Sequence, residues 1–239
     1  MGEMRMFIDV SKCMACRGCQ VSCKQWNGLK GEKTTNTGSY QNPPDMTAST
    51  WTVVKFKEVK DGGKVKWNFF KDQCRHCLEP PCLMVSQVKG SIIQDRTGAV
   101  VFTDLTKKEN FKDIHEACPY NIPRLDEASG RIYKCTLCID RISNGLEPAC
   151  AKTCPPGAIK FGKEKEILKM ARDRLKEVKA RYPDASLVDE DSVTVIYLLT
   201  EKKENYQISE KPHPFSSLLA LKKLLNPWEG LGIGSYLRS

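Results

Sequence analysis

The sequence has no hydrophobic run that could cross a bilayer, which takes about 20 apolar residues. Its longest apolar stretch, residues 193–199 (VTVIYLL), is typical of a buried strand. Residues 1–8 are too short and too polar for a signal peptide, so we expect no export signal on this chain, although a partner could still carry it across a membrane after folding. The chain has 239 residues, 40% of them hydrophobic, which excludes a disordered protein.

Sequence patterns of several functional classes are also missing. No Ser–His–Asp arrangement is visible, and the glycine-containing segments 62–66 and 232–236 are too weak to be phosphate-binding loops. The formal net charge is +9, but no tract of lysine and arginine with interleaved aromatic residues accompanies it. We therefore expect no nucleic-acid partner.

Cysteine, in contrast, is abundant and is arranged in groups. The first group lies in residues 12–26, KCMACRGCQVSCKQW, with the spacing C-x2-C-x2-C-x3-C. Two later segments, QCRHCLEPPC and KCTLCIDRISNGLEPACAKTC, also contain C-x2-C pairs. The twelve cysteines are Cys13, Cys16, Cys19 and Cys23; Cys74, Cys77 and Cys82; Cys118 alone; and Cys135, Cys138, Cys150 and Cys154.

Three kinds of chemistry can explain so many thiols. A chain of this length does not need six disulfides, and the C-x2-C spacings repeat too regularly for them. Zinc suits a pair of C-x2-C knuckles but gives no reason for the first group, in which three thiols reach one centre and the fourth turns away. A 4Fe–4S cluster gives that reason, because a short loop reaches three of its irons while the next cysteine ligates a different cluster. We favour clusters, with zinc or disulfides as the alternatives.

Ferredoxin-type pairing distributes the cysteines over three 4Fe–4S clusters. Three cysteines of one motif join the last cysteine of its partner motif, and each oxidised cluster with its thiolates carries about −2, which offsets much of the formal positive charge. We name the predicted sites by their ligands. Site A is Cys13, Cys16, Cys19 and Cys154; site B is Cys23, Cys135, Cys138 and Cys150; and site C is Cys74, Cys77, Cys82 and Cys118.

A fourth site is predicted to be lost. The spacing that would build it beside site C requires cysteines at four positions, and these hold Ser86, Lys108, Phe111 and Ile114. Because both halves of the site lack their ligands, the absence supports the pairing. Ser86 on its own, without companion ligands, is not expected to bind iron.

The rest of the chain predicts an α+β fold. We expect strands at 6–10 and 192–200, hairpins around 61–63 and 96–97, a polar loop over 27–50, an amphipathic helix over 163–182 and a short helix over 213–228. The architecture is two interleaved bacterial-ferredoxin-like modules with small β-hairpins and short helices, plus a C-terminal helix–strand extension. Residues 1–64 with 126–162 form the first module, 65–125 the inserted second module, and 163–239 the extension and tail.

Four other residues near the cysteines are candidates for tuning a cluster. Arg17 and Arg75 lie inside cysteine loops and are expected to offset cluster charge. His76 lies between two cysteines, where a packed or solvent-facing ring is favoured over a direct role. Trp26 could shield a cluster from water, or simply pack in the core.

The motifs CMACRGCQVSCKQWN, CRHCLEPPC, ACPYNIPR and CTLCIDRISNGLEPACAKTCPPGAI resemble those of one family. It is the iron–sulfur beta subunits of molybdenum- or tungsten-dependent oxidoreductases of the dimethyl-sulfoxide-reductase superfamily. The chain is most similar to formate dehydrogenase beta subunits with three clusters; the loop NTGSYQNPPD and the missing fourth site both point that way. The resemblance covers residues 6–162 strongly and continues more loosely to about 200.

This resemblance implies an electron-transfer subunit without a catalytic site of its own. A catalytic alpha subunit would oxidise formate to CO2 at a molybdenum or tungsten bis-pterin centre. Three clusters in this chain would then pass the electrons to a cytochrome c, a ferredoxin or a membrane subunit. It also implies a periplasmic location, reached together with the partner, with the cytoplasm as the alternative.

Three other functions stay open on the sequence. The same relay could serve a polysulfide, dimethyl sulfoxide or arsenate reductase. The chain could also be a free polyferredoxin without a pterin partner, or a zinc-stapled binding scaffold.

Overall fold

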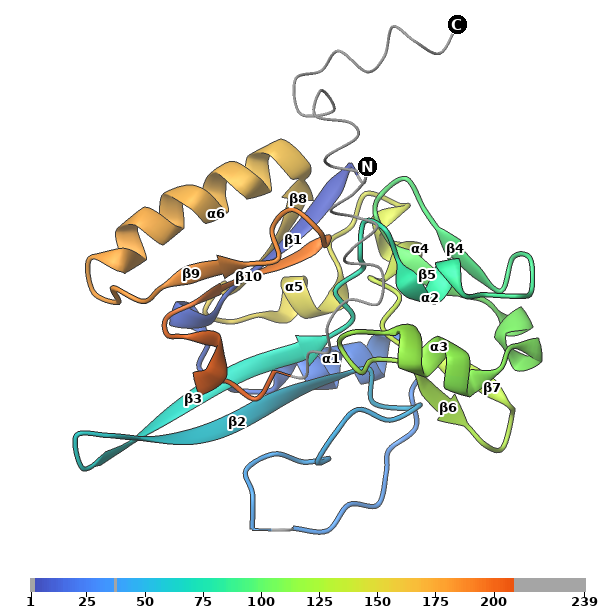
Figure 1. Ribbon diagram of the computed structural model, residues 1–239, viewed down its shortest axis with the longest axis horizontal. Coiled ribbons are helices and arrows are strands. Elements are labelled where there is room, and N and C mark those ends of the chain that lie inside the picture. Colours follow the sequence, from blue (N-terminus) through green and yellow to red (C-terminus); the bar gives the residue numbers. More distant parts are fainter. Residues whose placement is uncertain (1–2, 37, 209–239) are drawn as a thin grey trace, which may run out of the picture.

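The computed structural model describes residues 3–36 and 38–208, and these contain mixed helices and strands, an α+β fold (Figure 1). The strands are β1 (Met4–Asp9), β2 (Thr52–Asp61), β3 (Lys64–Gln73), β4 (Ile92–Gln94), β5 (Val100–Phe102), β6 (Arg124–Asp126), β7 (Arg131–Tyr133), β8 (Ile159–Lys163), β9 (Ser186–Val188) and β10 (Val195–Leu199). The helices are α1 (Gly18–Trp26), α2 (Pro81–Met84), α3 (Phe111–Ala117), α4 (Ile139–Ile142), α5 (Ala149–Thr153) and α6 (Glu164–Lys179), with 3-10 turns η1 (Val10–Lys12), η2 (Asp104–Lys108) and η3 (Lys203–Asn205).

A four-stranded sheet of order β8-β1-β10-β9 gathers segments from both ends of the described chain. β10 runs parallel to β1, with Met6 opposite Val195, while β8 and β9 run antiparallel to their neighbours. All five residues of β10 are buried, as expected for a central strand covered on both faces. The predicted strands at both positions are therefore confirmed.

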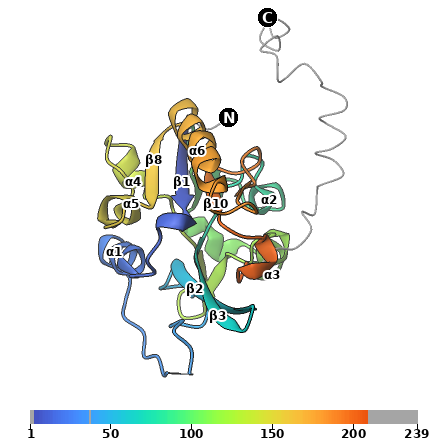
Figure 2. The ribbon, with the colours of Figure 1, turned by 90° about the vertical axis from the view of Figure 1, so that its left-hand side faces the viewer.

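The two faces of β10 pack against different parts of the molecule. Ile196 and Leu198 belong to the same apolar cluster as Ile167 and Ala171 of α6, so α6 covers one face of the sheet (Figures 1 and 2). Tyr197 faces the other side, where its ring stacks on Phe70 of β3 at 4.7 Å. The amphipathic pattern that predicted the helix over 163–182 is confirmed in α6.

The longest hairpin joins β2 and β3 in register from Thr52 opposite Gln73 to Asp61 opposite Lys64. Gly62 and Gly63 have φ of +54° and +82°, the left-handed conformation that a two-residue hairpin turn requires and that glycine adopts without strain. The predicted hairpin is confirmed, and so is the second one, β4–β5.

Some elements differ from the expectations or lie beyond them. The hairpin β6–β7 and the short helices α2 to α5 were not located by sequence patterns, because segments of three to seven residues carry too little periodicity. Within the described residues, no helix or strand lies between α1 and β2, in agreement with the predicted loop. The short helix predicted over 213–228 lies outside the described residues.

Candidate metal centres

The twelve cysteines line three separate cavities, four to each cavity. The cavity at site A contains Cys13, Cys16, Cys19 and Cys154; the one at site B contains Cys23, Cys135, Cys138 and Cys150; and the one at site C contains Cys74, Cys77, Cys82 and Cys118. The space between protein atoms is about 380, 330 and 340 Å³ respectively, part of it open to solvent. The structure therefore brings together the same quartets that the spacing groups.

Two short helices divide their cysteines between sites A and B. In α1, Cys19 faces the cavity of site A and Cys23, four residues on, faces that of site B. In α5 and its C-terminal cap, Cys150 lines site B and Cys154 lines site A. Because α1 and α5 pack against each other, each helix contributes one thiol to each site. Residues four apart lie one helical turn apart, so this spacing serves two adjacent centres.

Three of the four C-x2-C loops turn in the same way. The residue before the second cysteine, Ala15, His76 or Leu137, has a left-handed φ of 53°, 49° or 57°. In two of the loops its backbone N–H donates to the first cysteine: His76 N lies 3.4 Å from Cys74 Sγ, and Leu137 N lies 3.4 Å from Cys135 Sγ.

The Ala15 backbone hydrogen bond likewise lowers the pKa of Cys13, although burial raises it more. A left-handed non-glycine residue costs roughly 1–3 kcal/mol. The left-handed residue recurs in three loops, which indicates that this conformation is needed to turn the thiols inward.

Site C is attached to the central sheet through its loop. Cys77 forms a β-bridge with Val193, and the backbone N–H groups of Thr194 and Val195 donate to the carbonyls of His76 and Arg75. The loop is therefore held by the segment that leads into β10. Pro81 begins α2, which carries Cys82, and Cys118 caps the C-terminus of α3.

Burial makes these thiols poor anions on their own. It raises the pKa of Cys19 and Cys23 to about 12, and that of Cys138 to about 11, with neighbouring cysteines adding to the effect. At site C it raises the pKa of Cys82 to about 12 and of Cys118 to about 11. Thiolate is the form that binds metal, so four such groups facing one space fit a cationic iron centre that compensates their charge.

We also searched the described residues for sites that hold a single metal ion and for helices that could span a membrane. No group of three or more His, Cys, Asp or Glu side chains is arranged to hold a single metal ion within the described ranges. In the same part of the chain, every helix is too short or too polar to span a bilayer.

Arg75 and His76, in the loop of site C, are both fully buried. The Arg75 guanidinium lies 4.0 Å from the ring centre of Tyr197 and 4.8 Å from that of Phe70, and 3.9 Å from the carboxylate of Asp72. His76 Nδ1 accepts a hydrogen bond from Val100 N at 3.0 Å, and burial lowers the pKa of the ring well below its ordinary value. Of the two placements expected for the His76 ring, packed or solvent-facing, the structure shows the packed one. A tuning role for His76 and charge compensation by Arg75, which lines site C, stay predictions.

Arg17 and Trp26 lie at opposite ends of the α1 region. Arg17 lines site A, donates to the carbonyl of Tyr40, and has its guanidinium 5.1 Å from the ring centre of Phe56. Trp26 is 45% exposed and its Nε1 donates to Asp140 at 2.8 Å, so core packing was the wrong interpretation for it. Its side chain links the surfaces of α1 and α4.

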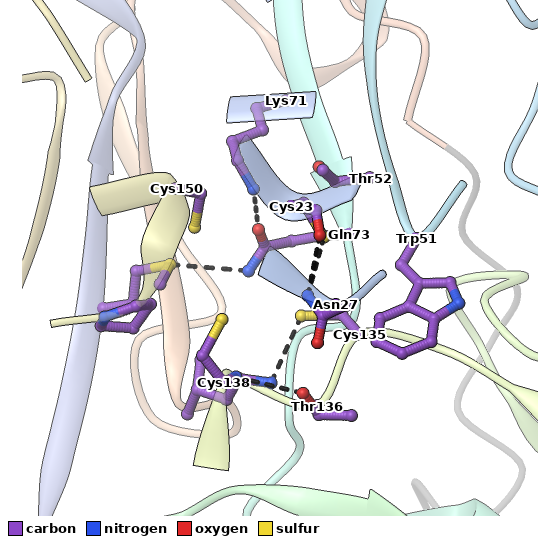
Figure 3. A pocket seen from close by; sticks show the side chains of 13 residues that line it. Cys23, Asn27, Trp51, Thr52, Lys71, Gln73, Cys135, Thr136, Cys138 and Cys150 are labelled. Atoms are coloured by element: carbon purple, nitrogen blue, oxygen red, sulfur yellow. Dashed lines mark hydrogen bonds between the residues drawn. The ribbon is translucent and has the colours of Figure 1, made fainter. Parts of the chain in front are cut away.

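Sequence patterns missed Lys71, a buried lysine that lines both site A and site B; Figure 3 shows it at site B. Its ammonium donates to Gln73 Oε1, and Gln73 Nε2 in turn lies 3.5 Å from Met6 Sδ. Burial lowers the pKa of Lys71, but the nearby Cys150 and Cys19 thiolates more than offset this and raise it above its ordinary value. Lysine on a strand is usually solvent-exposed, so no local signal distinguishes this one.

The four positions of the lost site do not come together as ligands. Ile114 is fully buried in an apolar cluster with Ile92, Val100, Phe102 and Ile132, and Phe111 packs against that cluster. Lys108 is exposed. Ser86 donates to the carboxylate of Glu109 at 2.6 Å, so its hydroxyl has a protein partner.

The chain is similar to known proteins of one family. Residues 65–164 match the model of the 4Fe-4S dicluster domain. The formate dehydrogenase 2 subunit beta (cytochrome c-553) of Nitratidesulfovibrio vulgaris is 48% identical over 206 residues, covering 83% of this chain and 94% of the relative.

Two further relatives agree. The formate dehydrogenase subunit beta of Megalodesulfovibrio gigas is 47% identical over 204 residues (84% of this chain, 95% of the relative). The nitrate-inducible formate dehydrogenase iron–sulfur subunit of Escherichia coli is 41% identical over 240 residues (96% and 80%). The chain therefore belongs to the iron–sulfur (beta) subunits of formate dehydrogenases, electron-transfer subunits that bind 4Fe–4S clusters and have no catalytic site of their own.

Proposed function

We propose that this chain relays electrons from the oxidation of formate through three 4Fe–4S clusters, one in each cysteine cavity. The observation that supports this most strongly is that all twelve cysteines fall into three cavities of four. The donors are soft thiolates in the number that one cluster requires, and each cavity is lined mainly by apolar and cysteine side chains.

Cysteines, backbone N–H groups and helices of the chain would have different roles in this relay. The thiolates of sites A, B and C would hold the clusters, each of which takes up and releases one electron when bound. The inward N–H groups of Ala15, His76 and Leu137 would donate to cysteine sulfur and so stabilise the more negative, reduced state. The sheet and the helix pair α1–α5 would hold sites A and B in fixed relation, because α1 and α5 each serve both sites.

The partner is proposed to be a catalytic subunit that oxidises formate at a molybdenum or tungsten bis-pterin centre. The relatives named above are formate dehydrogenase subunits, and one of them carries cytochrome c-553 in its name. A cytochrome c is therefore our first choice of acceptor, with a ferredoxin or a membrane subunit as the other candidates. We propose a periplasmic location reached together with the catalytic subunit.

The test is anaerobic purification of the native complex through a tag on this chain. We expect a co-purifying catalytic subunit with one molybdenum or tungsten, and about twelve irons in this chain. Formate should reduce the clusters of this chain, followed by electron paramagnetic resonance (EPR), and oxidised cytochrome c should reoxidise them. Iron without molybdenum or tungsten would point to a free polyferredoxin, and reduction by another substrate but not formate would assign the relay to a different enzyme.

A further inference from the structure

A positively charged side chain separates the two cavities that share α1 and α5. Lys71 lies on β3, is only 2% exposed, and lines both site A and site B. Figure 3 shows its side chain reaching toward the cavity of site B beside Gln73 and Cys150. A buried ammonium is costly unless an anion or several hydrogen bonds compensate it.

Within the described residues, no carboxylate forms an ion pair with Lys71, and its ammonium donates to the neutral side-chain amide of Gln73. Lys55, on the neighbouring strand, is equally buried but points to the opposite face of the hairpin, because alternate residues of a strand face opposite sides. Its ammonium lies 2.8 Å from the carboxylate of Asp72. The hairpin thus neutralises one buried lysine with a carboxylate, whereas the other lines two cavities that together hold eight cysteines.

Site C has a lysine of its own in a similar situation. Lys134 is 4% exposed, lines the cavity of site C, and donates to the carbonyls of Val100 and of Cys135, the latter at 3.1 Å. In the described ranges, no carboxylate forms an ion pair with Lys134. Each of the three cavities is therefore lined by a buried lysine, in addition to Arg17 at site A and Arg75 at site C.

We propose that the Lys71 ammonium is the shared counter-ion of the two electron carriers in sites A and B. Lys134 has the same role at site C. Reduction adds one electron, hence one negative charge, to a centre, and no bond or proton changes. A fixed positive charge nearby stabilises the reduced state and so raises the reduction potential. Because Lys71 faces two cavities, it sets two potentials together. This inference rests on the proposed function, since it requires three clusters.

The test is a redox titration of the native complex in which EPR follows the three cluster signals separately. In Lys71→Gln, two of the three midpoint potentials should shift to more negative values while the third stays within error. In Lys134→Gln, the remaining one should show the largest negative shift. Lys71→Arg keeps the charge and should leave all three midpoints near their wild-type values. The different sets of signals moved by the two lysines identify the effect without prior assignment of the spectra.

Three outcomes would overturn the inference: no shift in Lys71→Gln, an equal shift of all three signals, or a shift in Lys71→Arg as large as in Lys71→Gln. If Lys71→Gln does not retain its iron, Lys134→Gln tests the inference instead. In that variant the negative shift of the midpoint potential must be largest in one signal. Fewer than three signals in the wild type would instead refute the proposed function. Three signals that do not respond selectively would refute only the role of the lysines.

Discussion

Two pairs of short helices in this molecule share a plan but differ in content. α1 packs against α5, and α2 packs against α3. In both pairs the matching positions are four residues apart, and a cysteine caps the C-terminus of α5 and of α3. The first pair contains Cys19 and Cys23 with Cys150 and Cys154. At the corresponding positions the second pair has Cys82 in α2 and Ser86 just past the end of α2, with Ile114 and Cys118.

The difference shows what replaces a centre when its ligands are absent. Beside site C, Ile114 fills the inner position and is part of a closed apolar cluster. At the rim, the carboxylate of Glu109 accepts hydrogen bonds from Ser86 Oγ at 2.6 Å, Ser91 Oγ at 2.5 Å and Val88 N at 3.0 Å. Apolar packing and one hydrogen-bonded carboxylate thus stabilise the region around α2 and α3. The corresponding pair, α1 and α5, instead contributes cysteines to two cavities.

The largest expected effect comes from removing a ligand of site B, which shares α1 and α5 with site A, and comparing it with the removal of a ligand of site C. Cys150→Ser should remove about four irons and also disturb the EPR signal of site A, because α5 holds Cys154 as well. Cys74→Ser should remove a similar amount of iron and leave the other two signals unchanged. Iron analysis and EPR of the two variant complexes measure this. Equal disturbance of the other signals by both variants would contradict the coupling of sites A and B.

The next effect concerns the core that occupies the lost site. Ile114→Ala should destabilise the chain by about 2–5 kcal/mol, because it leaves a cavity among fully buried side chains. The matched control is Ile93→Ala on β4, a residue that is 45% exposed, with an expected cost below about 1 kcal/mol. The apparent Tm of the anaerobic complex compares them, and an equal loss in both variants would show that Ile114 does not support this region.

Glu109 offers a smaller effect that depends on pH. Burial raises its pKa, but hydrogen bonds from Ser86 and Ser91 outweigh this and hold it below the ordinary value. Its contribution is therefore fully present above the ordinary glutamate pKa of about 4.3 and is lost as the pH falls through the lower, folded-state value. Glu109→Gln should cost about 1–3 kcal/mol at neutral pH, measured as a loss of apparent Tm.

The exposed Glu127 provides the control for this variant. Glu127→Gln should leave the apparent Tm unchanged. A Glu109→Gln complex as stable as the wild type at pH 7 would mean that the hydrogen bonds at this rim contribute nothing to the fold.

The smallest effect is expected at the surface of the first helix pair. Trp26→Ala removes the hydrogen bond to Asp140 and the stacking of the Arg141 guanidinium, which lies 4.1 Å from the ring centre. The expected cost is at most about 1 kcal/mol, with all three midpoint potentials unchanged. A shift in one midpoint would show that Trp26 shields a centre from water, as one of the sequence interpretations held.

Cysteine spacing carried most of what could be predicted about the sites. The quartets formed by spacing coincide with the cavities, because C-x2-C loops and residues four apart on a helix have local, repeatable geometry. Iron ligation itself stays a prediction. Lys71 could not be found this way, since its burial depends on the packing of β3 beneath two cavities formed by distant segments.

Strands and the long helix were predictable from periodicity, whereas their arrangement was not. The pattern of residues 193–199 indicates a buried strand but cannot say that it runs parallel to β1. Likewise, Glu109 reads as an ordinary surface glutamate. Its partner Ser86 lies 23 residues away in sequence, and only the fold brings the two together.

The most direct measurement is an iron anomalous-scattering map from crystals of the anaerobic native complex. We predict three compact iron peaks on this chain, each surrounded by one cysteine quartet, and no peak between Ser86 and Ile114. A single metal ion in any of the three cavities, or a quartet made of cysteines from two of the predicted sites, would contradict the three-cluster relay.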